Sequence, residues 1–76
     1  MNEKEETIES VRNLVVSIAL KYLGRGVEPE DLVQSGIEGA LLAYNKFDPA
    51  AGTKFSTYAY YWIEKKIIDE VNYSGR

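Results

Sequence analysis

The chain contains neither cysteine nor histidine, and each absence excludes kinds of chemistry. Without cysteine there is no disulfide bond and no thiolate metal site. Without histidine, a serine triad, a cysteine–histidine pair and most zinc sites are excluded as well. An enzyme that uses Glu38 or Asp69 as a base is disfavoured, because neither carboxylate has a partner at useful helical spacing. We therefore expect no catalytic residue, no metal and no cofactor.

The sequence also lacks any run that approaches the roughly 18 to 20 apolar residues of a membrane span. Its first six residues, MNEKEE, are too acidic for a secretory signal. The expectation is a soluble cytoplasmic protein with no membrane partner. A length of 76 residues corresponds to one small domain with a compact core.

A basic excess, which is usual in proteins that bind nucleic acid, is missing too, since the formal net charge is −3. The imbalance lies in residues 1–10, an acidic lead-in with four glutamates and one lysine. Residues 11–76 are neutral, with eight charges of each sign. The net charge therefore does not exclude a nucleic-acid partner for the rest of the chain.

Two short segments rich in glycine and proline divide the chain into three parts. They are Gly24-Arg25-Gly26, followed by Pro29, and residues 48–53, DPAAGT. Apolar residues recur at helical spacing in all three parts. The sequence predicts an all-α fold: a compact bundle of three main helices, at about 5–23, 29–46 and 56–72, joined by short Gly/Pro loops in one domain that spans residues 1–76.

The first helix carries more apolar surface than one partner helix covers. A stripe about 80° wide holds Ile8, Val11, Val15, Ile18, Ala19 and Tyr22. Outside it lie Leu14, Val16, Leu20 and Leu23. Either two helices flank the first one, or part of its apolar surface stays exposed.

The second helix has an expected core face and an expected outer face. The core face is Val33, Gly36, Ile37, Ala40, Tyr44 and Phe47. Glycine costs about 1 kcal/mol relative to alanine inside a helix, so Gly36 and Gly39 are expected to permit close approach of another backbone. The outer side carries Asp31, Ser35, Glu38 and Leu42, with Gln34 and Leu41 at its edge. Its leucines indicate either a docking surface or the scattered leucines common on protein surfaces.

The third helix is expected to have Ser56 as its N-cap, with Phe55 just outside it. One apolar line holds Ala59, Ile63 and Ile67, and a line on nearly the opposite side holds Tyr58, Tyr61, Lys65, Ile68 and Asn72. Both lines cannot face a single core. Aromatic rings between lysines suit single-stranded nucleic acid, since rings stack on bases and cations pair with phosphates, but aromatic clusters also fill cores. The residues alone leave both interpretations open.

Several sequence blocks follow one another between residues 11 and about 70. They are NLVVSIA at 13–19, Lys21-Tyr22 with GRG at 24–26, DLVQ at 31–34 with Gly36 and Gly39, KFDP at 46–49, Gly52, KFSTYA at 54–59, and Trp62-Ile63. In this order and spacing they resemble conserved region 2 of bacterial sigma factors of the sigma-70 family. The stretch from 46 to 59 is the most specific part of the resemblance.

The resemblance implies a domain that binds the clamp helices of the largest subunit of core RNA polymerase and captures the non-template single strand of the promoter minus-ten element. The docking residues it implies are Asp31, Gln34, Ser35, Glu38 and Leu41. The DNA contacts it implies are Lys54, Phe55, Ser56, Thr57, Tyr58, Tyr61, Trp62, Lys65 and Lys66. Tyr58 would support the first flipped base, and Trp62, with Tyr61, would pack at the upstream fork. The lysines at 65 and 66 would lie at the upstream edge of the element.

Some positions depart from the housekeeping pattern of the family. Tyr61-Trp62 replaces a tryptophan pair, and Glu64 replaces an arginine. Ser35 and Ile37 replace the acidic residue and the asparagine typical of the docking helix. These departures predict an alternative sigma factor, bacterial and located at the nucleoid through RNA polymerase, for which an anti-sigma factor is a further candidate partner.

Other interpretations remain open beside this one. The chain could be a sigma-like regulator that occupies RNA polymerase without reading DNA, or a helical module that self-associates through its aromatic face. The sequence has no counterpart of the region that reads the minus-thirty-five element. This absence indicates either a fragment of a longer factor or a naturally minimal one, and an end just after the third helix favours a fragment from the start of a longer factor.

Overall fold

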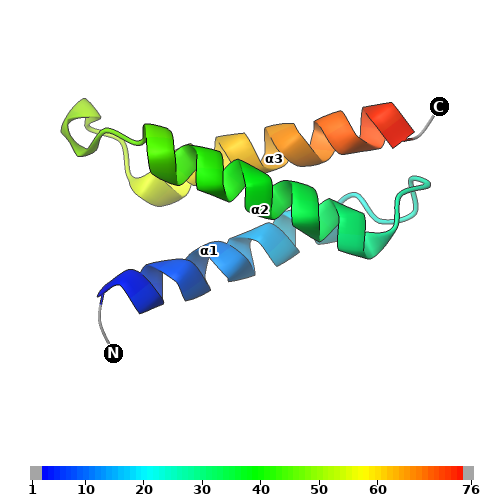
Figure 1. Ribbon diagram of the computed structural model, residues 1–76, viewed down its shortest axis with the longest axis horizontal. Helices are drawn as coiled ribbons and strands as arrows, with labels where there is room; N and C mark the ends of the chain where they lie inside the picture. Colours follow the sequence, from blue (N-terminus) through cyan, green and yellow to red (C-terminus); the bar gives the residue numbers. More distant parts are fainter. Residues whose placement is uncertain (1–2, 75–76) are drawn as a thin grey trace.

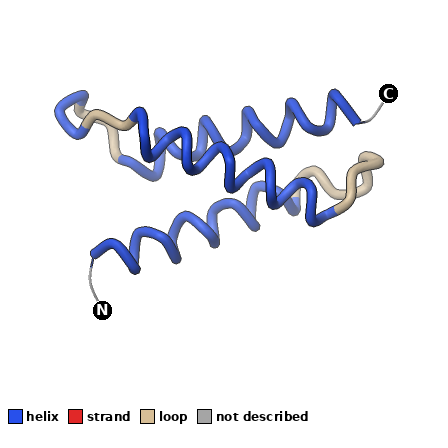
Figure 2. The backbone as a smooth tube through the Cα atoms, viewed as in Figure 1, coloured by secondary structure: helices blue, strands red, loops and turns tan. Residues whose placement is uncertain are grey.

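The computed structural model describes residues 3–74, with their side chains from Glu9 to Tyr73. This part of the chain forms three α-helices, α1 (Glu3–Leu20), α2 (Pro29–Lys46) and α3 (Phe55–Ser74), and a short 3-10 helix, η1 (Pro49–Ala51). Figure 2 shows that the remaining described residues are loop. The predicted all-α bundle is confirmed. None of these helices is long and apolar enough to cross a membrane.

The bounds of α2 match the prediction, whereas α1 ends at Leu20 and not at about 23. The chain leaves the helix through tighter turns, in which the N–H groups of Lys21 and Tyr22 donate to the carbonyls three residues earlier. Gly24 and Gly26 then have φ angles of 79° and 86°, which glycine adopts without strain. The two glycines therefore stop the helix and redirect the chain, as the sequence indicates.

The start of α3 differs from the prediction by one residue. The helix begins at Phe55, and the N–H of Tyr58 donates to the carbonyl of Lys54. Lys54 therefore occupies the capping position, and the expectation that Ser56 caps the helix is wrong. As a result, Phe55 is the first residue of α3, and the helix sets the position of its ring relative to the rings that follow.

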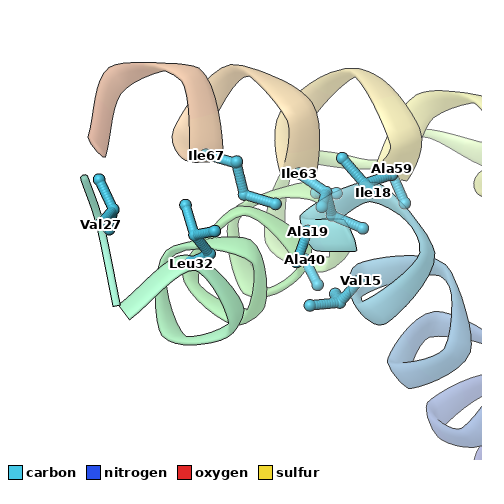
Figure 3. Packing of buried hydrophobic residues seen from close by; sticks show 10 residues of the cluster. Val15, Ile18, Ala19, Val27, Leu32, Ala40, Ala59, Ile63 and Ile67 are labelled. Atoms are coloured by element: carbon cyan, nitrogen blue, oxygen red, sulfur yellow. The ribbon is translucent and has the colours of Figure 1, made fainter. Parts of the chain in front are cut away.

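α2 and α3 run antiparallel beside each other (Figure 1), and α1 packs against both, with Val11 and Leu14 partly buried against the core. The core lies where the three helices meet, and Figure 3 shows most of its side chains. It consists of Val15, Ile18, Ala19, Val27, Leu32, Ala40, Ala43, Ala59, Ile63 and Ile67. The apolar line predicted for α3 is thus buried, as expected. Val16 and Leu20 on α1 are exposed, as is Leu23 in the turn after it, so the other helices leave part of this apolar surface uncovered. The side chain of Ile8 lies outside the described residues.

The core face of α2 is rotated from the predicted one. Its buried residues are Leu32, Ser35, Gly36, Gly39, Ala40 and Ala43, whereas Ile37 and Tyr44 are exposed. The small residues decide this, because α3 can approach closely only where α2 has no large side chains. Gly39 lies directly against the α3 backbone, as predicted, but Gly36 lies against the side chains of Val15, Ile63 and Ile67.

Candidate functional site

Six aromatic rings from α2, the loop after it and the first half of α3 form one continuous chain of contacts, which we call the aromatic row. In order, the rings are Tyr44, Phe55, Phe47, Tyr58, Trp62 and Tyr61. Ring centroids of neighbours are between 5.2 Å and 6.5 Å apart, and most pairs meet edge to face. The row brings together all four aromatic residues that the resemblance implies for DNA binding.

The loop between α2 and α3 brings Phe47 into contact with the rings of α3. Phe47 is the C-cap residue that follows α2, and its N–H donates to the carbonyl of Ala43. The carboxylate of Asp48 then accepts from the N–H of Ala50 at 2.9 Å, and Gly52 takes a φ of 83°. This tight connection returns the chain so that Phe47 lies 5.2 Å from Phe55, between centroids.

The aromatic row lies outside the aliphatic core. Its two end rings are largely exposed, at 63% for Tyr44 and 60% for Tyr61. The four inner rings are half-buried, and three of them, Phe55, Tyr58 and Trp62, pack against the core. Because aliphatic side chains already fill the centre, the rings form an outer layer that both supports the fold and presents aromatic surface.

Trp62 is the inner ring of the row that lies between Tyr58 and Tyr61. Its Nε1 atom is buried and has no hydrogen-bond partner among the described residues. Lys46 places its ammonium group 6.0 Å from the centre of the indole ring. Lys46, Phe47 and Tyr44 were missed as site residues, because they precede the third helix and only the tertiary fold brings them to it.

The polar residues predicted for DNA binding have different surroundings. Lys54, Ser56 and Thr57 are exposed at the start of α3. Lys65 is exposed and pairs with Asp69 at 3.6 Å. Lys66 is half-buried, and it points about 100° away from Lys65 around the helix. Of the two lysines, Lys65 therefore shares the outer face with Tyr58 and Tyr61.

The outer face of α2 presents four of the five residues implied for docking. Asp31, Gln34, Glu38 and Leu41 are all exposed, and Leu41 is exposed at 59%. Ser35 is an exception, since it is only 8% exposed and its hydroxyl donates to Glu70 at 3.4 Å. Gln34 lies on the exposed face of α2. Ser35 lies about 100° further around the helix, which turns its side chain toward Glu70 on α3. Its expected place on an exposed docking face is therefore wrong.

A polar cluster joins the end of α1 to α3. The ammonium group of Lys21 donates to the hydroxyl of Tyr60 and, at 3.4 Å, to Glu64, and the hydroxyl of Tyr22 donates to Glu64 at 3.3 Å. The hydrogen bond with Tyr60 raises the pKa of Lys21. Burial, followed by the charge of Glu64, raises the pKa of Tyr22. Glu64 thus has two structural partners in the turn that follows α1. Within the described part of the chain, acidic side chains do not gather into a group that could hold a metal ion.

The three helices carry an aromatic row with exposed ends and an acidic outer face on α2, and they define a small all-α domain. Residues 7–76 match the family model described as Sigma-70 region 2, and the chain belongs to this family. It is 47% identical, over its full length, to the RNA polymerase sigma-C factor of Nostoc sp.. It is 44% identical over 96% of its length to the sigma factor SigA4 of Synechococcus elongatus, and 41% identical over 96% to the chloroplastic sigma factor sigD of Arabidopsis thaliana.

The chain spans only part of these relatives. The matches cover 18% of the Nostoc protein, 24% of the Synechococcus protein and 17% of the Arabidopsis protein. The similarity therefore concerns one segment of each of these longer sigma factors.

Proposed function

We propose that this chain is the part of a transcription initiation factor that binds core RNA polymerase and holds the melted non-template strand of the promoter minus-ten element. The observation that carries the proposal is the aromatic row, in which Phe55, Tyr58, Trp62 and Tyr61 form one surface in a chain of the Sigma-70 region 2 family. A row of rings outside a filled core suits bases that have left a duplex.

The row would act by stacking. Each base that leaves the duplex loses its neighbours at a cost of a few kcal/mol, and an aromatic ring returns roughly 1 to 3 kcal/mol per base. Tyr58 would support the first flipped base, while Trp62 and Tyr61 would pack at the fork where the duplex ends. Lys54 and Lys65 are exposed near these rings, where they can pair with phosphates. The bond-forming chemistry would belong to the polymerase.

Docking to polymerase would use the outer face of α2. Asp31, Gln34, Glu38 and Leu41 are the proposed contacts to the clamp helices of the largest subunit, and buried Ser35 is no longer included. Residues 27–45 contain four acidic residues and no basic one, so the face suits a basic partner surface. Residues 11–76 have no net positive charge, so polymerase would supply much of the attraction to DNA.

The factor would be of the alternative type, since Tyr61 and Glu64 stand where the housekeeping pattern has tryptophan and arginine. The structure is compatible with this change, because the carboxylate of Glu64 accepts hydrogen bonds from Lys21 and Tyr22. A preference for a minus-ten element different from the housekeeping one would follow.

The test is a titration of the chain, with and without core polymerase, against single-stranded promoter oligonucleotides that carry one base change at a time. With polymerase, we expect selection of one sequence over its scrambled form. Tyr58→Ala should weaken this binding roughly 5- to 150-fold, the loss of one stacked base. Tyr73→Ala, an exposed tyrosine near the other end of α3, is the control.

Three outcomes would contradict the proposal. Failure to bind a clamp-helix fragment would remove the polymerase contact. Binding to polymerase with no dependence on Tyr58 or Trp62 would indicate a regulator that does not read DNA. A stable oligomer in sedimentation, dispersed by Tyr61→Ala, would indicate a self-association module.

A further inference from the structure

Tyr44 is part of the aromatic row but has no role in the proposed function so far. It lies in the last turn of α2, and its ring is 63% exposed. Its centroid is 6.5 Å from that of Phe55, with an angle of 85° between the ring planes. This contact links an exposed ring on α2 to the rings of α3.

The geometry of Tyr44 leaves a surface for a ligand. An edge-to-face contact with one neighbour cannot cover both faces of a ring. The contact with Phe55 nevertheless restrains the ring, so that a ligand would meet a partly ordered partner. Tyr44 and Tyr61 are also alike, since each is an exposed end of a row whose inner rings are half-buried.

The charges near Tyr44 favour DNA over a basic protein surface. Between residues 44 and 58 there are two lysines, Lys46 and Lys54, and one acidic residue, Asp48. The carboxylate of Asp48 accepts a hydrogen bond from Ala50 in its own loop. The acidic residues of α2 lie closer to its N-terminus, with Glu38 the last of them. The end of the row on α2 is therefore the less acidic part of that helix.

We infer that Tyr44 is a further stacking position for a base of single-stranded DNA, separate from the base on Tyr58. Phe47 and Phe55 lie between the two tyrosines in the row, so one base cannot reach both rings. The inference rests on the proposed function and extends the path of the strand from α3 onto the C-terminal end of α2.

The experiment uses the full chain bound to core polymerase and single-stranded oligonucleotides of about 12 nucleotides, each with one abasic position. For the unchanged chain, an abasic site opposite a stacking ring should weaken binding roughly 5- to 150-fold. In Tyr44→Ala this loss should disappear at one position, and in Tyr58→Ala at a different one. Tyr44→Phe should behave like the unchanged chain, because stacking does not need the hydroxyl. Tyr73→Ala should leave the whole profile unchanged.

The results separate this inference from the proposed function. If Tyr58→Ala alters the abasic profile and Tyr44→Ala does not, the inference fails and the proposed function stands. If neither variant alters the profile, both fail. If Tyr44→Ala weakens binding to polymerase without DNA and leaves the profile unchanged, Tyr44 contacts protein, which also overturns the inference. Because Tyr44 is exposed, its replacement by alanine should not unfold the chain.

Discussion

A Cβ atom at Gly39 would lie 2.5 Å from the carbonyl oxygen of Trp62 and 2.8 Å from the Cα atom of Ile63. Both obstacles belong to the backbone of α3, so neither can move aside by a side-chain rotation. This contact sets the distance between α2 and α3 at the level of Trp62. It therefore also holds the aromatic row, whose rings come from both helices and from the loop between them.

Gly39→Ala should lower the free energy of unfolding by about 1 to 3 kcal/mol, the usual cost of overpacking. The loss should appear even though alanine favours a helix interior by about 1 kcal/mol over glycine. Urea denaturation followed by circular dichroism measures it. Glu38→Ala, at the exposed neighbouring position, should stay within about 0.5 kcal/mol of the unchanged chain. A variant at Gly39 that is more stable than the unchanged chain would contradict the close contact.

Ser35→Glu should destabilise the fold. The side chain at 35 is buried and its hydroxyl bonds Glu70, so a second carboxylate would be desolvated beside a like charge. The expected loss is on the order of 1 to 3 kcal/mol at neutral pH, and it should shrink as pH falls, because protonation removes the charge. Gln34→Glu, on the exposed face, is the matched control. Equal stability of both variants would show that position 35 is not buried in solution.

The cluster of Lys21, Tyr22 and Glu64 predicts a loss of stability at high pH. The pKa values of Lys21 and Tyr22 are both raised in the folded chain, so the unfolded chain releases these protons first. The free energy of unfolding should therefore be unaffected at neutral pH and should fall above about pH 10. Urea denaturation across this range measures the slope. Tyr22→Phe removes one of the two titrations and should make the fall shallower. An identical pH profile for the two chains would disprove the role of Tyr22.

Leu41 and Leu20 allow the docking face to be tested with a matched pair. The two leucines are equally exposed, at 59% and 60%, but Leu41 lies on α2 and Leu20 at the end of α1. Leu41→Ala should weaken the capture of polymerase, whereas Leu20→Ala should not, and neither should change the unfolding midpoint by much. Pull-down with a clamp-helix fragment gives the comparison. Equal losses for both variants would mean that exposed leucines act nonspecifically.

The spacing of apolar residues along the sequence was sufficient to predict the three helices and part of the core. The repeat of 3.6 residues identifies the buried line of Ala59, Ile63 and Ile67 on α3, and proline with two acidic residues marks the start of α2. The order and spacing of the sequence blocks were sufficient to identify the family. These features depend on residues close in sequence, so no tertiary contact is needed to recognise them.

Which side of α2 faces inward was decided by tertiary packing alone. Hydrophobic spacing favours large apolar residues such as Ile37 and Tyr44, but both are exposed. Gly36, Gly39 and Ala43 are buried instead, because α3 packs where α2 is smallest, and this turns Ser35 inward. The aromatic row likewise joins Tyr44 and Phe47 to the rings of α3 only after the chain has folded back. Sequence determined which rings are available, and the approach of α2 to α3 determined which of them meet.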